Sequence, residues 1–289
     1  MNYTLNTTLS SLTSFKIGGK CKSVIYPENG DDVKRIIAYM NEHGEKYFIL
    51  GNGTNVLFSD NGFDGHIISC TGLNEIAIDE DTGAVTAGAG VNLTLLAYKV
   101  SKMGYGGLEF AYGIPGSVGG GVYMNAGAYG SELSSVIESV EYFDISSGEV
   151  KNVPAKEIYF GYRKTSFMDM NTVILSAKLS LKKGSPEESL ALCDEYMARR
   201  KDKQPLEFPS AGSVFKRCEG RFTGEMIEKC GLKGYRIGGA QVSEKHAGFI
   251  VNRGGATAQD VLALIDHIKK TVYARYGVSL ECEVRVVGE

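Results

Sequence analysis

The spacing of apolar residues predicts a small α/β unit in the first 70 residues. Val33, Ile36, Ile37 and Met40 recur at helical spacing and are followed by Gly44, which predicts an amphipathic helix that stops at this glycine. The apolar runs SVIYP and KYFIL on either side of that helix predict strands. The second run leads directly into the polar, glycine-containing stretch GNGTNVLFSD.

The pattern changes between residues 71 and 183. Short strands such as IAID and AVTAGAG are separated by Gly and Asn turns, and the longer strands SSVIESVEYFD and NTVILSAKLSLKKG follow. One helix interrupts them, and we expect its buried face to hold Leu93, Leu96, Val100 and Met103.

A further boundary is predicted near Gly184. SPEE forms a capping box with Pro186 at the first helical position, and TAQD opens a second, longer helix with Val261 and Leu264 on its core face. The chain closes on SLECEVRVVG, which predicts a strand with Leu280, Cys282, Val284 and Val286 on one face. We therefore predict an α+β chain of three lobes: residues 1–70, 71–183 and 184–289.

Composition and charge narrow the class of protein. The chain is 43% hydrophobic and 22% charged, as in globular proteins, and its net charge of −3 offers no general attraction for nucleic acid. MNYTLNTTLSSLTSF lacks the features of a secretory signal, and no apolar run reaches the ~18 residues of a membrane span. The six cysteines are irregularly spaced, without a C-x-x-C pair. We expect a reduced, cytoplasmic and monomeric protein without a metal site, a membrane partner or a nucleic-acid partner.

The glycine-rich stretch GIPGSVGGGVYMNAGAYG, residues 113–130, is costly to order because glycine loses more backbone entropy than any other residue. Two common phosphate motifs are absent. GNGTNVLFSD has Val56 where a dinucleotide-binding turn needs its third glycine, and GGKCKS has Cys21 after Lys20 and lacks the first glycine of a P-loop. Two interpretations stay open on these grounds: a backbone nest for an anion, or turns in a β-rich domain.

Seven motifs in this order resemble the UDP-N-acetylenolpyruvoylglucosamine reductase family, in its shorter subtype: TSFKIGG, LGNGTNVLFSD, GLEFAYGIPGSVGGGVYMNAGAYG, FGYRKTSF, PSAGSVFK, GLKGYRIGGAQVSEKHAGFIVN and ECEVRVVG. The resemblance covers about residues 12–288. It implies an FAD-binding fold of the vanillyl-alcohol-oxidase (PCMH) type, in which two lobes hold the flavin and a third binds substrate. It also implies that NADPH is the hydride donor. The expected product is UDP-N-acetylmuramate, a peptidoglycan precursor made from UDP-N-acetylglucosamine enolpyruvate.

By the same resemblance, the two glycine segments wrap FAD with main-chain groups. The residues implied are Gly51, Asn52, Gly53, Thr54, Asn55, Gly113, Ile114, Pro115, Gly116, Ser117, Gly119, Gly120, Asn125, Ala126, Gly127, Ala128 and Tyr129. None of the four histidines and no cysteine lies in these segments, so we expect the flavin to be bound non-covalently.

The resemblance also implies three catalytic residues. Arg163 matches the arginine beside the enolate that forms when hydride adds to the enolpyruvyl group, and its planar guanidinium suits a carboxylate. Ser213 matches the proton donor, and Glu283 matches the glutamate that supports the same intermediate. Without the resemblance, these residues would be interpreted as a surface ion-pair residue, a turn serine and part of a charged strand face.

Substrate contacts are implied at Tyr162, Lys203, Arg217 and His246. Arg199, Arg200, Lys201 and Lys203 form a basic cluster with Lys216 and Arg217 nearby, but basic residues also complement the C-terminal end of a helix. Family members commonly have a proline shortly after the FK of the serine motif. Here Cys218 follows Arg217, so the shape of that turn is open.

Two other functions remain possible on the sequence. One is an FAD-dependent oxidase of the same fold that acts on a sugar or alcohol and uses O₂. The other is a flavin- or nucleotide-binding module without catalysis. NADPH consumption that requires the enolpyruvyl sugar nucleotide distinguishes the reductase from both.

Overall fold

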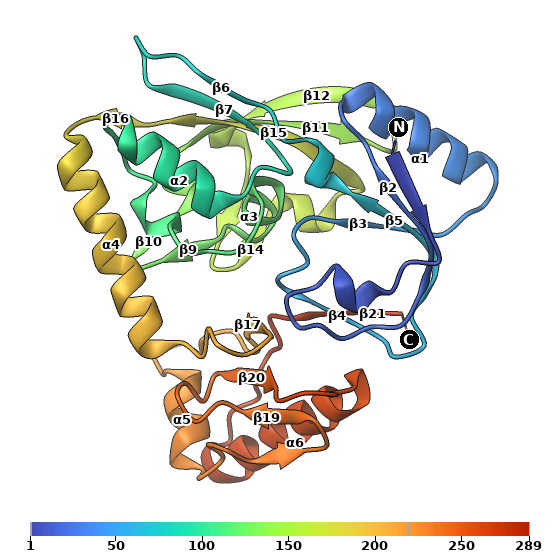
Figure 1. Ribbon diagram of the computed structural model, residues 1–289, viewed down its shortest axis with the longest axis vertical. Helices are drawn as coiled ribbons and strands as arrows, with labels where there is room; N and C mark the ends of the chain where they lie inside the picture. The colour runs from blue at the N-terminus through green and yellow to red at the C-terminus, as the bar shows by residue number, and fades with distance from the viewer. Residues whose placement is uncertain (1, 219, 289) are drawn as a thin grey trace. The chain divides into compact units, whose positions relative to one another are not determined.

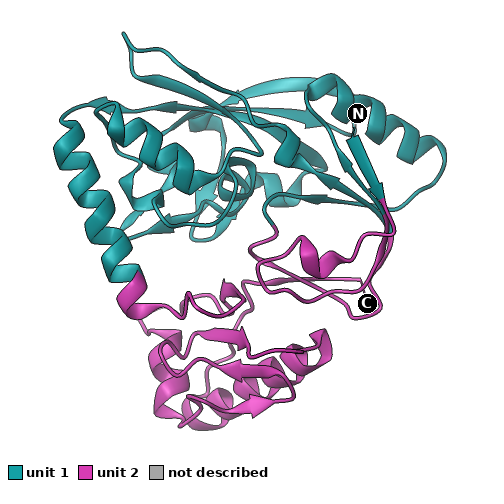
Figure 2. Cartoon of the chain, viewed as in Figure 1, with its two compact units in different colours: residues 1–4, 23–52, 65–200 teal, residues 5–22, 53–64, 201–289 magenta. Residues whose placement is uncertain are grey.

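The computed structural model describes residues 2–218 and 220–288, and these form two compact units. Of the described residues, unit 1 comprises 2–4, 23–52 and 65–200, and unit 2 comprises 5–22, 53–64, 201–218 and 220–288 (Figures 1 and 2). The chain passes between the units several times, so neither is one continuous stretch. The three-lobe boundaries expected from the sequence remain a prediction.

The larger sheet of unit 1 has five antiparallel strands in the order β12-β11-β15-β7-β6. Their bounds are β6 (Ile76–Ile78), β7 (Ala84–Gly88), β11 (Ile137–Asp144), β12 (Glu149–Pro154) and β15 (Thr172–Ser180). The helices α2 (Leu93–Lys102) and α3 (Val118–Met124) contribute Leu93, Leu96 and Val122 to the same core as the sheet residues Val140 and Ala177. This core positions the glycine segment that contains α3.

A second sheet has the order β1-β2-β5-β3. Its strands are β1 (Asn2–Leu5), β2 (Cys21–Tyr26), β5 (Phe63–Ser69) and β3 (Tyr47–Leu50), the last of which runs parallel to β5. Helix α1 (Gly30–Glu42) buries Val33, Ile36, Ile37 and Met40, as predicted, and Gly44 beyond its end has a φ of +64°. The helical spacing of the apolar residues and the glycine after them therefore predicted this helix and its end correctly.

Unit 2 contains a four-stranded antiparallel sheet in the order β17-β20-β19-β18. Its strands are β17 (Ser210–Ser213), β18 (Arg236–Ile237), β19 (Ala240–Val242) and β20 (Phe249–Asn252), and its helices are α5 (Thr223–Lys229) and α6 (Ala258–Tyr276). Helix α6 begins with the predicted Thr257–Asp260 capping box. Asp60 accepts two further hydrogen bonds from the N–H groups of Ala258 and Gln259, at 2.8 and 3.1 Å.

Unit 2 also contains a parallel pair, β4 (Val56–Phe58) with β21 (Arg285–Val287). The remaining elements are α4 (Pro186–Lys203), the short strands β8 (Tyr105–Gly106), β9 (Gly127–Ala128), β10 (Ser131–Glu132), β13 (Phe160–Gly161), β14 (Lys164–Thr165) and β16 (Lys182–Lys183), and the 3₁₀ turns η1 (Leu9–Ser11), η2 (Cys70–Gly72), η3 (Glu109–Ala111), η4 (Leu133–Ser135), η5 (Ala155–Glu157) and η6 (Ser166–Asp169). The predicted α+β class is confirmed.

Some predicted details were wrong. Met103 is the C-cap of α2 and is 37% exposed, because the helix ends before this residue could face the core. The strand predicted over SLECEVRVVG is limited to Arg285–Val287, apart from an isolated bridge at Cys282, and Val286 is 37% exposed. Cys282 forms its bridge with Phe215, whereas Arg285–Val287 pair with β4. The segment is therefore divided between two partners.

Within the described residues, no helix combines the length and the apolar character that crossing a bilayer requires. In the same part of the chain, no group of three or more His, Cys, Asp or Glu side chains is arranged to bind a metal ion.

Candidate active site

Gly51 and Asn52, the first two residues of one glycine segment expected to bind FAD, lie beside the other segment in unit 1. Asn52 Nδ2 donates a hydrogen bond to the carbonyl oxygen of Pro115 at 3.0 Å. A Cβ atom on Gly51 would lie 2.4 Å from Ser117 Oγ, so a larger residue there would displace this hydroxyl. Ser117 Oγ in turn accepts the N–H of Gly120 and caps the start of α3. The first segment is therefore fastened to the turn that opens this helix.

Backbone donors remain available along the first segment. The N–H groups of Gly51 and Asn52, and of Gly53 and Thr54 that follow, make no hydrogen bond to other residues in the described parts of the chain. Gly120 is exposed, and a Cβ there would have only Ser117 Oγ nearby, at 3.4 Å. Successive N–H groups of this kind bind phosphate oxygens, so the segment fits a ligand that carries a pyrophosphate.

Arg163 contacts the second glycine segment. It lies in the two-residue loop between β13 and β14, and its Nη2 donates to the carbonyl oxygen of Gly127 at 2.9 Å. Asn125, which ends α3 with a φ of +45°, is fully buried and donates from Nδ2 to the carbonyl oxygen of Gly161 at 3.1 Å. The structure thus connects the predicted catalytic arginine, and the hairpin that carries it, to the predicted flavin segment.

Tyr129 fastens the end of the same segment to α4. Its ring stacks on that of Tyr196, with centroids 4.3 Å apart and planes 4° apart, and its hydroxyl donates to the carbonyl oxygen of Tyr196 at 2.9 Å. The guanidinium carbon of Arg199 lies 5.0 Å from the centroid of the Tyr129 ring. Tyr129 has a φ of +55°, an unfavourable backbone conformation for a tyrosine that these contacts maintain.

Arg200 is a buried arginine beside the second glycine segment, and the sequence did not single it out from its basic cluster. It is only 9% exposed and donates from Nη1 to the carbonyl oxygen of Gly113. A Cβ on Gly113 would lie 3.1 Å from Arg200 Cδ, so the glycine allows the arginine stem to lie against the backbone. The local sequence shows only that this residue is basic. Its burial against Gly113 depends on the tertiary fold.

Ser213 and Glu283 lie on neighbouring segments of unit 2. The N–H of Glu283 donates to the carbonyl oxygen of Val214 at 2.8 Å. Asn55, the last residue of the first predicted flavin segment, donates from Nδ2 to the carbonyl oxygen of Glu283 at 3.1 Å. Three predicted site residues from distant parts of the sequence are therefore adjacent.

His246, in unit 2, has the surroundings of a neutral imidazole that donates a hydrogen bond. Its Nδ1 accepts the N–H of Gly248 at 3.1 Å, and its ring lies edge-on to Phe249, with centroids 5.0 Å apart. Burial lowers the pKa of His246 below its ordinary value of 6.5. Because the N–H of Gly248 needs an unprotonated Nδ1, the neutral ring carries its proton on Nε2. The side chain is therefore prepared to donate one hydrogen bond.

The other predicted substrate residues are divided between the units. Tyr162, in the loop with Arg163, is 46% exposed and belongs to unit 1. Lys203, the last residue of α4, and Arg217, whose guanidinium carbon lies 5.9 Å from the Phe222 ring centroid, belong to unit 2. No described contact joins any of these three side chains to Ser213.

The turn after Ser213 is stabilised without a proline. Thr223 Oγ1 donates to the carbonyl oxygen of Lys216 at 2.7 Å, and Cys218 Sγ lies 3.7 Å from the same hydroxyl. The N–H of Lys216 donates to the carbonyl oxygen of Glu281 at 2.9 Å. Hydrogen bonds to α5 and to the C-terminal segment therefore restrain this turn.

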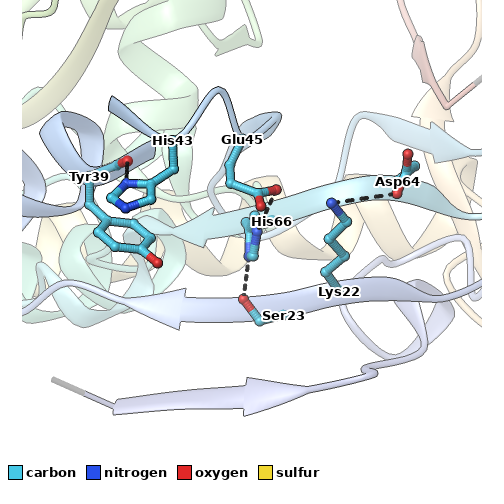
Figure 3. A network of polar contacts seen from close by, with 7 residues as sticks. All are labelled: Lys22, Ser23, Tyr39, His43, Glu45, Asp64 and His66. Carbon is cyan, nitrogen blue, oxygen red and sulfur yellow. Dashed lines mark hydrogen bonds and ion pairs between the residues drawn. The ribbon is translucent and has the colours of Figure 1, made fainter. Parts of the chain in front are cut away.

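A Ser–His–Glu arrangement occurs elsewhere in unit 1 but lacks the access that a nucleophile needs. Ser23 Oγ lies 2.7 Å from His66 Nδ1, and His66 Nε2 lies 3.3 Å from Glu45 Oε2 (Figure 3). Ser23 is only 5% exposed, so a substrate carbonyl cannot reach its hydroxyl. The three side chains connect β2, β5 and the residues before β3, and we interpret the arrangement as structural.

Comparison with known proteins agrees with this geometry. The family described as "FAD binding domain" matches residues 21–154, and "UDP-N-acetylenolpyruvoylglucosamine reductase, C-terminal domain" matches residues 204–287. With the joined glycine segments, the first match defines the chain as an FAD-binding flavoprotein, as predicted.

Relatives narrow this class to one family. UDP-N-acetylenolpyruvoylglucosamine reductase from Clostridium novyi is 44% identical over 284 residues, which cover 98% of this chain and 92% of the relative. The protein of the same name from Caldanaerobacter subterraneus is 43% identical over 285 residues, which cover 99% of this chain and 93% of the relative. The crystal structure of UDP-N-acetylenolpyruvylglucosamine reductase from Thermus caldophilus has a TM-score of 0.83 and 33% identity, and the match covers 99% of this chain and 98% of that one. The chain belongs to the UDP-N-acetylenolpyruvoylglucosamine reductase family.

Proposed function

We infer that this protein uses NADPH and bound FAD to reduce the enolpyruvyl group of UDP-N-acetylglucosamine enolpyruvate, which yields UDP-N-acetylmuramate for peptidoglycan synthesis. The observation that carries the inference is the hydrogen bond from Arg163 to the Gly127 carbonyl, because it fixes a cation beside the predicted flavin segment in a member of this family. Both reactants are anionic small molecules of the cytoplasm, where we place the reaction. We retain the expectation of a monomer.

The residues of unit 1 fit a bound FAD. The free N–H groups of Gly51 and Asn52 and the exposed Gly120 suit its pyrophosphate, and the segment from Gly113 to Tyr129 lies beside them. When bound, FAD supplies a group that accepts hydride from NADPH and gives hydride to the substrate. The protein must then orient the substrate and stabilise the charge that develops on it.

Arg163 is suited to that charge. Hydride addition at the terminal carbon of the enolpyruvyl double bond moves the π electrons toward the carboxylate, which becomes an enolate. A guanidinium offers two parallel donors to such a group and stays charged at all working pH values. Because the Gly127 carbonyl orients Arg163 in advance, little reorganisation is needed when charge develops.

Ser213 and Glu283 complete the addition in this proposal. The enolate carbon beside the ether oxygen takes a proton from Ser213 Oγ, which forms the new C–H bond and leaves an alkoxide that solvent reprotonates. A strongly basic enolate makes a hydroxyl an adequate acid. The N–H of Glu283 donates to the carbonyl oxygen of Val214, the residue after Ser213, and this bond holds the two segments side by side. We assign the carboxyl group of Glu283 to support of the same intermediate.

The remaining site residues recognise the sugar nucleotide. Lys203 and Arg217 supply local positive charge for the UDP pyrophosphate, because the net charge of the chain is −3. The Nε2–H of His246 and the hydroxyl of Tyr162 offer neutral donors for the sugar and its substituents. These four assignments follow the family positions of the residues.

An anaerobic absorbance titration tests the function. The purified protein should be yellow, and its flavin bands should bleach with NADPH and return when UDP-N-acetylglucosamine enolpyruvate is added without oxygen. Recovery that occurs only after air enters would favour an FAD oxidase instead. Bleaching that neither the sugar nucleotide nor air reverses, or a colourless preparation that binds no FAD, would contradict both.

A further inference from the structure

Arg200 holds an unpaired polar atom inside the flavin-binding unit. Among the buried side-chain nitrogen and oxygen atoms of residues 2–218 and 220–288, its Nε is the one without a hydrogen-bond partner. A buried guanidinium N–H that lacks an acceptor loses its hydrogen bond to water without replacement. Such a loss is unusual in a folded protein, and it indicates that the partner is a bound group.

The surroundings of Arg200 identify the kind of partner. Its Nη1 is bonded to the carbonyl oxygen of Gly113, and its stem lies where a Cβ on Gly113 would be. One turn earlier on α4, the carbonyl of Tyr196 accepts the Tyr129 hydroxyl. Helix α4 therefore contacts both ends of the second glycine segment, and a ligand along that segment lies within reach of Arg200.

We propose that Arg200 is a flavin-contacting residue: its Nε donates a hydrogen bond to the isoalloxazine ring of bound FAD. This proposal rests on the proposed function, because it requires FAD in the second glycine segment. The ring gains negative charge when two electrons and one proton are taken up. A fixed cation beside it stabilises the reduced form and raises the midpoint potential.

The ring is a better partner for Arg200 than the pyrophosphate. The N–H groups without acceptors that suit phosphate lie at Gly51 and Asn52, which are joined to Pro115 and Ser117. Arg200 follows Arg199 on α4, and the guanidinium of Arg199 lies over the ring of Tyr129. The Tyr129 end of the segment is also where Arg163 binds Gly127. Because Arg163 is placed beside the reacting end of the substrate, this part of the segment belongs to the ring.

The test is the two-electron midpoint potential of bound FAD in Arg200→Gln and Arg200→Lys, measured against a reference dye without NADPH or sugar nucleotide. We expect Arg200→Gln to shift the equilibrium with the dye at least tenfold toward oxidised flavin, or about 30 mV. Arg200→Lys keeps the charge but loses the planar donor, so its shift should be smaller. The absorbance maximum of the bound flavin should move in both variants.

Arg35→Gln is the matched control, because it removes one arginine from an exposed position of the same unit. Its flavin should keep the wild-type potential. Potentials equal to wild type in both Arg200 variants would overturn the proposal, and so would weaker FAD binding with an unchanged potential, which indicates a phosphate contact. If Arg200→Gln fails to fold, Arg200→Lys alone decides the matter. None of these measurements requires substrate turnover. An error in the proposed substrate would therefore leave their results unchanged.

Discussion

At the residue scale, Arg163 shows how a side chain is oriented before substrate arrives. Its φ of +53° is unusual for a residue other than glycine and costs on the order of 1–2 kcal/mol. The short hairpin and the bond to Gly127 maintain that conformation. Backbone strain at such a position is consistent with a functional role, because a relaxed loop would aim the guanidinium elsewhere.

Replacement of Ser213 by alanine should separate the two half-reactions. Bleaching of the flavin by NADPH should stay close to the wild-type rate, because no proton from Ser213 is needed. Reoxidation by the enolpyruvyl sugar nucleotide should slow about 10²–10⁴-fold, the usual contribution of a general acid. Stopped-flow absorbance measures both steps, with Ser210→Ala in the same strand as control. Equal slowing of both steps would show that Ser213 is not the proton donor.

The partly buried His246 predicts a pH dependence of stability. The pKa of His246 is lower in the folded chain than in the unfolded chain. As pH falls below about 6.5, this residue therefore binds a proton in the unfolded chain before it does so in the folded chain. The stability that this residue contributes is therefore present above that pH and is lost as pH falls toward the pKa of the folded state. For each pH unit, the unfolding equilibrium constant rises by at most about tenfold.

Urea unfolding between pH 7.5 and 5 measures this effect. His246→Gln should lose less stability over that range than the wild-type protein, whereas His43→Gln, at an exposed position, should behave like wild type. A wild-type slope in His246→Gln would mean that other groups cause the acid sensitivity.

At the element scale, α3 forms in spite of its sequence. Three consecutive glycines and two valines give it a poor intrinsic helix propensity, and the sequence analysis expected no helix there. Ser117 caps its first turn, and Gly121 allows close packing, since a Cβ there would lie 2.8 Å from side-chain atoms of Leu93 and Leu133. The glycines therefore serve helix packing as well as the turn.

Two neighbouring glycines of α3 should respond differently to alanine. A Cβ on Gly119 would lie 2.7 Å from that of Ala89, so Gly119→Ala should destabilise the protein by about 1–3 kcal/mol. Gly120→Ala meets only the Ser117 hydroxyl at 3.4 Å and should keep or slightly raise stability, while it weakens FAD binding. Urea unfolding of the apoprotein and FAD fluorescence quenching measure the two effects. Equal loss of stability in both variants would contradict this division.

At the scale of the whole molecule, bound FAD should stabilise the protein. A ligand that binds only the folded state adds about 2.7 kcal/mol at 100 times its dissociation constant. For a chain of 289 residues, that corresponds to a rise in Tm of about 4–5 °C. Scanning calorimetry of apoprotein with increasing FAD measures it, with FMN, which lacks the pyrophosphate and adenosine, as a weaker control. A Tm that does not change with FAD would contradict flavin binding to the folded chain.

The sequence by itself determined the local elements, the class and the family. Helix α1, its buried face and its glycine stop, and the capping box of α6, follow from spacing and end residues within a few positions of one another. The ordered motifs gave the resemblance to the reductases, which the relatives confirm. Both kinds of information are local in the chain, so no long-range packing was needed to find them.

Only the tertiary structure decided which distant segments meet. The contacts of Gly51 with Ser117, of Glu283 with Val214 and of Arg200 with Gly113 join residues far apart in sequence, and no local period encodes them. The helix within the glycine run and the exposure of Met103 have the same origin. In each case the free energy of packing against a distant segment outweighs the local preference of the residue, and that term exists only once the chain is folded.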